Sequence, residues 1–321
     1  MDLNRIYAPI QGDLEKIKEE IKSVAEIDYP WLSKQLDYIL GETGKAMRPV
    51  LVLLSGKCFE YNWELLLPMG VSVELMHTAT LVHDDAIDKA ATRRGRNTMN
   101  SLWGDEIAIL MGDYLFAKAG EYVADTQSPR VVKLFSRTLA IISSGEIGQF
   151  RGSYNLKQTR EQYFRRIYRK TASLFSLSTQ SGAILCGATE EQVQAMKDYA
   201  DNLGIAFQIV DDILDFTSTK ETMGKPVGGD LIQGTLTLPA MMIIEKNPAD
   251  NPVKHIFEKK DFNYVKDAID QVRNSKIIPD CYKIVNEYAD KACSRLKTLP
   301  KSQSREALLA LADFVINQGK K

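Results

Sequence analysis

Two acidic motifs with the same spacing are the residues of this chain best suited to do chemistry. They read Asp84-Asp85-Ala86-Ile87-Asp88 and Asp211-Asp212-Ile213-Leu214-Asp215. On a helix, the first and last aspartates of each motif share one face, so like charges gather and repel one another. Mg²⁺ suits such a site, because it takes oxygen ligands and typically binds one or two carboxylates together with phosphate groups. The pattern predicts a Mg²⁺ site for a diphosphate compound, with a solvated acidic surface as the alternative.

The surroundings of the two motifs favour the metal site over the acidic surface. Each motif directly follows an apolar stretch, where burial is expected and an unpaired charge is costly. Each is then followed by an irregular stretch, residues 89–97, which is basic, and residues 218–234, which is rich in glycine. The glycine-rich stretch carries Lys225 and is a candidate lid over the diphosphates, with an ordinary surface loop as the alternative.

Basic residues near the motifs would balance the charge of two diphosphates. They are Lys45, Arg48, Arg93, Arg94, Lys170 and Lys225. Arginine and lysine are the side chains that bind phosphate oxygens with charge-assisted hydrogen bonds. Taken without further information, the same residues are also consistent with ordinary surface charge.

The elements that must position these residues are predicted to be helices. Leu14, Ile17, Ile21 and Val24 recur at intervals of three and four, which is typical of an amphipathic helix. Helix starts are indicated by Ser128-Pro129 and by capping-box patterns at Thr159 with Gln162 and Thr189 with Gln192. We find no run of alternating strands, no Asn-Gly hairpin and no Pro/Ser-rich linker. An all-α fold in a single domain, residues 1–321, is therefore expected.

Composition limits the class of protein further. The chain has 41 basic and 42 acidic side chains, a net charge of −1, which argues against nucleic acid as a partner. Its apolar stretches fall short of the roughly 18 residues that span a bilayer, and the N-terminus lacks a secretory pattern, so we expect a cytoplasmic protein. The four cysteines show no Cys-x-x-Cys spacing and are expected to be reduced.

From about Gly41 to its C-terminus the sequence resembles the trans-prenyltransferase family, the head-to-tail polyprenyl diphosphate synthases, and within it the long-chain hepta- and octaprenyl types. The resemblance is carried by both aspartate motifs and by Gly44-Lys45-Ala46-Met47-Arg48-Pro49, His77, Arg93-Arg94-Gly95, Gly112-Asp113-Tyr114-Leu115-Phe116, Lys170-Thr171, Phe207-Gln208 and Gly224-Lys225. It implies an isoprenoid-synthase-type helical bundle around a deep central cavity. It also implies that the two motifs face each other across the cavity mouth and that the protein is a homodimer.

The resemblance assigns roles to these residues. Mg²⁺ would be held by Asp84, Asp85, Asp88, Asp211 and Asp215. Isopentenyl diphosphate would be bound by Lys45, Arg48, His77 and Arg94, and the allylic diphosphate, farnesyl or geranylgeranyl, by Arg93, Lys170 and Lys225. Thr171 and Gln208 would face the allylic cation, and the catalytic set is Asp84, Asp88, Lys170, Thr171, Gln208 and Asp211. Taken alone, His77, Thr171 and Gln208 are ordinary helix residues.

Product length is expected to depend on the residues that precede Asp84. At 1.5 Å per residue, Ala79 and Thr80 lie about one turn below the metal site. In the family an aromatic residue there closes the cavity, so these small side chains imply that the chain grows past them toward Met76. We expect a long product, of about six or more isoprene units.

Three alternatives stay open. A terpene cyclase or squalene-type synthase uses similar carbocation chemistry but usually replaces the second Asp-Asp-x-x-Asp motif. A catalytically weak or regulatory subunit of a heteromeric synthase usually loses aspartates, and this chain has all six. A short-chain farnesyl or geranylgeranyl synthase would differ mainly in cavity depth. An apolar product suggests at most peripheral contact with a membrane.

Overall fold

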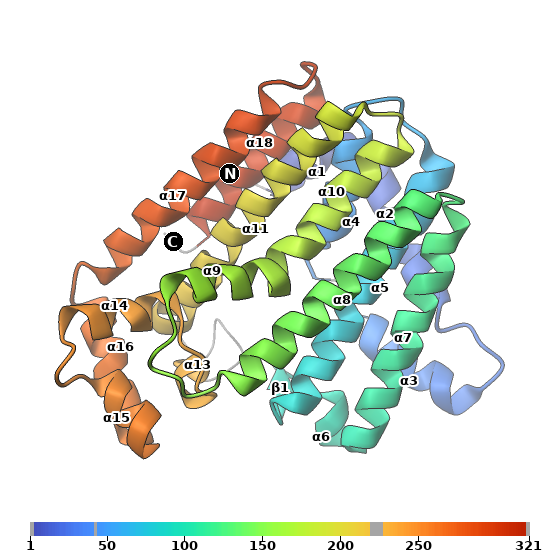
Figure 1. Ribbon diagram of the computed structural model, residues 1–321. Coiled ribbons are helices and arrows are strands. Elements are labelled where there is room, and N and C mark those ends of the chain that lie inside the picture. Colours follow the sequence, from blue (N-terminus) through green and yellow to red (C-terminus); the bar gives the residue numbers. More distant parts are fainter. Residues whose placement is uncertain (1–2, 42–43, 219–226, 319–321) are drawn as a thin grey trace.

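The computed structural model describes residues 3–41, 44–218 and 227–318, and these are almost entirely helical (Figure 1). The all-α expectation is confirmed. The longer helices are α2 (Gln11–Ser23), α3 (Pro30–Leu40), α4 (Met47–Gly56), α5 (Trp63–Ile87), α7 (Asp105–Asp125), α8 (Pro129–Arg151), α10 (Ser173–Leu185), α11 (Glu190–Thr217), α17 (Ile277–Leu296) and α18 (Gln303–Asn317). Shorter ones are α1 (Leu3–Tyr7), α6 (Met99–Trp103), α9 (Arg160–Ile167), α13 (Gly229–Ile232), α14 (Leu238–Lys246), α15 (Pro252–Lys259) and α16 (Val265–Arg273).

The helix starts that the sequence indicated are present. Thr159 and Thr189 each form a complete capping box with the glutamine three residues later, at the starts of α9 and α11. The Ser128 side chain accepts a hydrogen bond from the amide of Val131 at the start of α8. Local hydrogen bonds to the first turn therefore set where these helices begin.

One small sheet departs from the sequence-based expectation. β1 (Thr92–Arg93) and β2 (Arg96–Asn97) pair antiparallel, with Arg93 opposite Arg96. The two turn residues, Arg94 and Gly95, have φ of 50° and 80°, which is the left-handed backbone that tight hairpins require. An Arg-Gly turn between two-residue strands has no alternating pattern, so sequence reasoning missed it.

The two longest helices, α5 and α11, carry the aspartate motifs at their C-terminal ends. The buried apolar residues form two clusters, and α11 contributes to both, with Leu203 in one and Ile209 in the other. In Figure 1, α11 and α10 run side by side along the bundle, and α8 and α5 each lie beside α10. The motifs are thus anchored at the ends of two long helices that contribute many residues to the buried clusters.

The helix α5 is long and apolar enough, by length and composition alone, to cross a membrane. This differs from the expectation that every apolar stretch is too short to span a bilayer, which counted only uninterrupted apolar runs. In the structure 61% of its most apolar window is buried inside the protein. That burial is what the central helix of a packed bundle shows.

All four cysteines are free in the structure, as expected from their spacing. Cys58, Cys186 and Cys281 are buried, and Cys293 is partly exposed.

Candidate active site

The first aspartate motif lies where α5 ends and the hairpin begins. Asp85 is buried, and its two carboxylate oxygens accept hydrogen bonds from Nε of Arg93 at 3.0 and 2.8 Å. Burial raises the pKa of Asp85, and Arg93 opposes this effect. Asp84 is largely covered, with 15% of its side chain exposed, whereas Asp88 is exposed at the helix end. Asp85 thus fixes the hairpin, and Asp84 and Asp88 are left for other partners.

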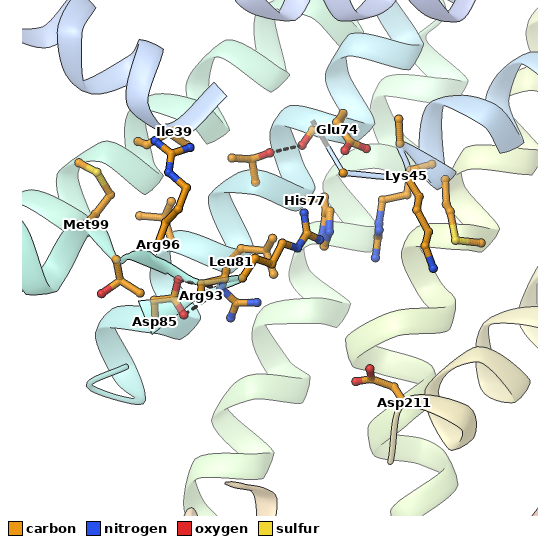
Figure 2. Close-up of a pocket in the computed structure, with 18 of the residues that line it drawn as sticks. Ile39, Lys45, Glu74, His77, Leu81, Asp85, Arg93, Arg96, Met99 and Asp211 are labelled. Carbon is orange, nitrogen blue, oxygen red and sulfur yellow. Dashed lines mark hydrogen bonds and ion pairs between the residues drawn. The ribbon is translucent and has the colours of Figure 1, made fainter. Parts of the chain in front are cut away.

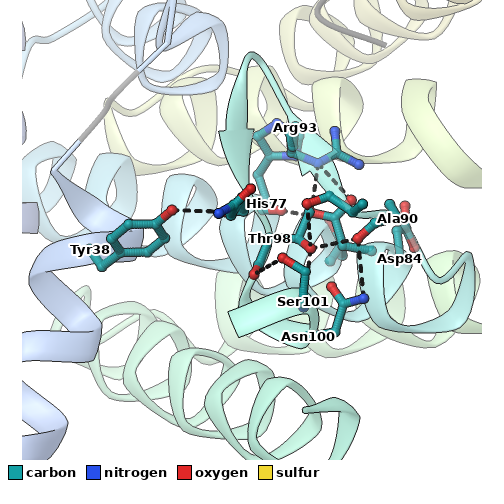
Figure 3. A network of polar contacts seen from close by, with 12 residues as sticks. Tyr38, His77, Asp84, Ala90, Arg93, Thr98, Asn100 and Ser101 are labelled. Atoms are coloured by element: carbon teal, nitrogen blue, oxygen red, sulfur yellow. Dashed lines mark hydrogen bonds and ion pairs between the residues drawn. The ribbon is translucent and has the colours of Figure 1, made fainter. Parts of the chain in front are cut away.

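A network of hydrogen bonds holds the segment that follows the motif (Figure 3). The Thr98 hydroxyl donates to the carbonyl of Ala90 at 2.5 Å, and the side-chain amide of Asn100 donates to the same carbonyl at 3.2 Å. Tyr38 on α3 donates from its hydroxyl to the carbonyl of Asn97 at 2.8 Å. These bonds satisfy the backbone of an irregular segment and hold the arginine-bearing hairpin against α5.

A cavity of about 610 Å³ opens beside this hairpin. One face of α5 forms a wall, with Glu74, His77, Leu81 and Asp85 among its residues. The predicted substrate-binding residues that line the cavity are Lys45, Arg48, His77, Arg93 and Arg94. Asp211 from α11 lines it too, and Figure 2 shows this side chain and Lys45 on the same side of the pocket. Asp85 and Asp211 therefore bring both motifs to one cavity.

The charges in the cavity are arranged for an anion. Burial lowers the pKa of Arg48 to about 10, and Glu74 opposes this effect. Burial and the neighbouring Arg48 and Arg94 hold the pKa of His77 well below its usual value, so its ring is neutral. Burial raises the pKa of Glu74. Five cationic side chains line the cavity against the three carboxylates of Glu74, Asp85 and Asp211. This leaves an excess of positive charge, as a diphosphate requires.

Gly44 leaves room for Arg94. A Cβ atom at this position would lie 2.5 Å from Nη1 of Arg94. We expect Gly44→Ala to displace the guanidinium and to raise the KM for isopentenyl diphosphate about tenfold, with little change in kcat. Steady-state kinetics checks this result. Gly12→Ala is the control, because a Cβ there meets nothing within 4 Å and its KM is expected to be unchanged.

The remaining predicted residues form a polar cluster next to this cavity. A π-helical turn, Tyr168–Ala172, connects α9 to α10 and carries Lys170 and Thr171. Nζ of Lys170 lies 3.5 Å from Oδ2 of Asp84 and 3.0 Å from Oε1 of Glu146 on α8. Burial acts to lower the pKa of Lys170, but Asp84 and Glu146 outweigh it and hold the pKa above its usual value. Lys170 therefore stays charged beside the first motif.

Thr171 reaches the second motif from the same turn. Its hydroxyl donates to Oε1 of Gln208 at 2.6 Å. The amide of Gln208 donates to Oδ1 of Asp212 at 2.9 Å and reaches Oδ2 of Asp211 at 3.4 Å. Lys170 and Thr171, adjacent in sequence, thus connect Asp84 on α5 with Asp211 on α11. π-Turns are often found at functional sites.

Two of the aspartates in the second motif are buried. Asp212 accepts a hydrogen bond from the Tyr163 hydroxyl at 2.6 Å, and burial, followed by the charge of Asp230, raises its pKa to about 7. Asp215 accepts one from the backbone amide of Asp230 at 3.3 Å. Asp211 is exposed at the cavity. The second motif therefore exposes the carboxylate of Asp211, whereas those of Asp212 and Asp215 are buried and hydrogen-bonded.

The donor set suits a hard cation. Desolvation, together with the neighbouring charges of Asp84 and Asp85, raises the pKa of Asp88, with Lys170 opposing. Such repulsion is relieved by a cation, and oxygen donors on both helices fit Mg²⁺. Within residues 3–41, 44–218 and 227–318, no three acidic, histidine or cysteine side chains converge on one point. This arrangement fits an ion that takes its other ligands from water and a diphosphate.

Some predicted residues lie elsewhere. Residues 219–226 of the candidate lid, which include Lys225, fall outside the described residues. Met76 and Ala79 are fully buried, Thr80 is partly exposed, and none of the three lines the 610 Å³ cavity. Their effect on product length stays a prediction.

Several polar residues of the site were missed by sequence reasoning. Glu74 lies three residues before His77 on the cavity face of α5, and that spacing is a signal that could have found it. Glu146 follows an apolar stretch of α8, so its burial was foreseeable. Gln318, which accepts a hydrogen bond from Lys45 at 3.2 Å, lies near the other end of the chain and gives no local signal.

Comparison with known proteins connects this geometry to a family. The polyprenyl synthetase family model matches residues 29–274. The chain is also 38% identical over 316 residues to heptaprenyl diphosphate synthase component 2 of Bacillus subtilis, covering 98% of this chain and 90% of that protein. The chain belongs to the polyprenyl synthetase family. It is a prenyltransferase of the long-chain type, and the predicted resemblance is confirmed.

Solved structures agree with this assignment to the polyprenyl synthetases. A decaprenyl diphosphate synthase from Rhodobacter capsulatus superposes with a TM-score of 0.92 at 33% identity, covering 100% of both chains. A polyprenyl synthase from Caulobacter crescentus, complexed with calcium and isoprenyl diphosphate, superposes with a TM-score of 0.94 at 29% identity, covering 99% of this chain and 98% of that one. The helical bundle is therefore the isoprenoid synthase fold.

Proposed function

We propose that this chain is a Mg²⁺-dependent synthase that extends an allylic diphosphate with isopentenyl diphosphate, in repeated head-to-tail steps, to a long all-trans polyprenyl diphosphate. Membership of the family supports prenyl chain elongation. The observation that carries the proposal is the contact of Lys170 with Asp84 and of Thr171 with Gln208, beside a cavity rich in cations. Two diphosphate sites thus adjoin at the aspartate motifs.

The first step is loss of diphosphate from the allylic substrate. When bound, Mg²⁺ stabilises the charge that develops on the leaving diphosphate. Asp84, Asp88 and Asp211 would hold the metal, with Asp85 and Asp215 in support. Lys170 donates to the diphosphate oxygens, which favours breaking the carbon–oxygen bond. The products of this step are a diphosphate and an allylic cation.

The second step joins the two substrates. Lys45, Arg48, His77 and Arg94 hold the diphosphate of isopentenyl diphosphate in the basic cavity, so its double bond lies next to the allylic cation. Neutral His77 donates a hydrogen bond without adding to the crowded positive charge. The double bond attacks the cation and a new carbon–carbon bond forms. The resulting intermediate then loses a proton, which the departed diphosphate accepts.

Thr171 and Gln208 present oxygen atoms to the cation. We expect Thr171→Val to lower kcat about tenfold and to leave both KM values nearly unchanged, because the valine has the same shape but cannot hold Gln208. Single-turnover kinetics measures this effect. Thr171→Ser keeps the hydroxyl and should retain most of the rate. Equal losses in both variants would show that the hydroxyl has no role.

A long product is the second part of the proposal. We expect the small side chains of Ala79 and Thr80 to let a chain grow past the first motif toward Met76. The relatives named above make heptaprenyl and decaprenyl diphosphates according to their names. A short-chain farnesyl or geranylgeranyl synthase is the runner-up, and product analysis distinguishes the two.

A homodimer is proposed as the working assembly. Phe150, Ile147 and Leu110 on α8 and α7 are 72%, 62% and 62% exposed, which is unusual for apolar side chains of this size. An apolar contact between two copies would cover them. A specific observation favours a second candidate: the Bacillus subtilis relative is called component 2, which suggests that this chain also works with a different subunit. The cytoplasmic location stays a prediction.

One experiment tests the proposal as a whole. The purified protein is incubated with Mg²⁺, isopentenyl diphosphate and farnesyl diphosphate, with and without a chelator, and extracted products are identified by mass. We expect linear long-chain polyprenyl diphosphates that disappear with the chelator. Cyclic products would support a cyclase. Activity that appears only after a second protein is added would support the two-component assembly.

A further inference from the structure

A second cavity, of about 220 Å³, lies between α8 and the segment that contains α9. The α8 wall is made by Gly145, Gly148, Gln149 and Gly152, which are spaced three, four and seven residues from the first and so share one face. A Cβ atom at Gly148 would meet nothing within 4 Å. Gly148 therefore leaves open space in the cavity, whereas Gly145 lets Arg169 approach α8 closely, because an added Cβ there would lie 2.9 Å from Cβ of Arg169.

The opposite wall is long and basic. It carries Gln158, Gln162, Arg165, Arg166 and Arg169. No aspartate or glutamate, and no apolar side chain, is among the described residues that line the cavity. In a chain with a net charge of −1, three arginines on one small polar cavity form a local excess of positive charge.

The arginines are held in place by weak or neutral partners. Nη1 of Arg166 donates to the side-chain oxygen of Gln158 at 2.8 Å, and Nη2 donates to the carbonyl of Leu236 at 2.7 Å. Arg165 pairs with Glu161 at 2.7 Å, but both side chains are largely exposed, so water weakens this pair. In the described part of the chain no carboxylate forms an ion pair with Arg166 or Arg169. The site thus has positive charge that its own carboxylates do not neutralise.

The position of the cavity connects it to the proposed reaction. Gly145 and Glu146 are neighbours on α8, and Arg169 and Lys170 are neighbours on the π-turn. Glu146 and Lys170 contact each other beside Asp84, whereas Gly145 and Arg169 line the second cavity. The second cavity therefore adjoins α8 and the π-turn, the two segments that would hold the allylic diphosphate through Glu146 and Lys170 (Figure 1 shows α8 and α9).

We propose that this second cavity is a binding site for a phosphate-type oxyanion, and that its ligand is inorganic diphosphate. The choice of diphosphate rests on the proposed function, which releases one diphosphate in each elongation step. Guanidinium groups bind such oxygens in forked pairs, and the neighbouring glutamine and Asn155 amides can donate further hydrogen bonds.

Calorimetric titration of the full-length protein with sodium diphosphate, in chelator and without substrate, tests the site directly. A Lys45→Gln/Arg94→Gln background lowers the positive charge of the first cavity. The part of the remaining binding that depends on Arg165 and Gly148 then reports the second cavity. In this background Arg165→Gln is expected to weaken binding about tenfold, and Gly148→Leu to abolish it by filling the cavity. Arg137→Gln, also on α8 but outside the cavity, is the matched control and should bind as the background does.

Two results would overturn the inference. One is the absence of diphosphate binding in the background variant, or binding that Arg165→Gln and Gly148→Leu both leave unchanged. The other is a phospholipid ligand: sedimentation with phosphatidic acid vesicles that depends on Arg165 while free diphosphate binding does not. Gly148 is on an exposed helix surface and leucine favours helices, so loss of folding is not expected, and circular dichroism checks it. Because no turnover is measured, failure of this site is distinguishable from failure of the proposed function.

Discussion

Asp211→Asn is expected to lower kcat for prenyl elongation by about 100- to 1,000-fold. Asp211 is the exposed carboxylate of the second motif and lines the basic cavity. Asparagine keeps the shape of the side chain and removes its charge, so the metal that would counter the developing charge of the leaving diphosphate would lose a ligand. The rate is measured with saturating isopentenyl diphosphate and farnesyl diphosphate.

A matched control lies on the same helix. Asp198 of α11 contacts Gln194 and Arg295 near the surface, away from both motifs. Asp198→Asn is expected to keep kcat within about twofold, because surface ion pairs contribute little. Equal activity in the two variants would exclude Asp211 from the reaction, whereas a fall in both would indicate a general effect on α11.

Thr80→Phe and Ala79→Phe are expected to shorten the product. A ring in either position, about one turn before Asp84, would block the path of a growing chain. Ala79 is fully buried, so its variant is also expected to lose about 1–3 kcal/mol of stability. Thr80 is partly exposed and shares the face of Asp84, so its variant should fold normally. Mass analysis of extracted products gives the chain-length distribution.

The control for chain length is on the opposite face of α5. Thr78 lines the basic cavity, so Thr78→Phe should weaken isopentenyl diphosphate binding and leave the longest product unchanged. If Thr80→Phe and Ala79→Phe gave the same products as the unmodified enzyme, neither residue would gate product length. If Thr78→Phe shortened the product as much as they do, a slower rate would explain all three results.

Features set by local interactions were predictable from the sequence. The capping boxes at Thr159 and Thr189 and the position of the motifs at helix ends follow from short-range hydrogen bonds and from apolar spacing. Family resemblance placed Lys45, Arg48 and Arg94, which do meet at one cavity. Arg94 lies on a different segment from Lys45 and Arg48, so spacing alone did not indicate that the three meet.

Features set by tertiary packing were not predictable. The π-turn that carries Lys170 depends on how α9 and α10 pack, and no local pattern marks it. The pairing of Asp85 with Arg93 depends on the hairpin, which hydrogen bonds to α5 and α3 hold in place. The glycine face of α8 became informative only when the structure placed it opposite three arginines.

The central claim is that both aspartate motifs hold one metal–diphosphate assembly. Electron paramagnetic resonance of Mn²⁺ in place of Mg²⁺, titrated with an unreactive farnesyl thiodiphosphate, measures the metal bound to that assembly. The account predicts that Asp84→Asn and Asp211→Asn each abolish most of this binding, while Asp198→Asn does not. Binding of Mn²⁺ that persists unchanged when either motif is altered would contradict it.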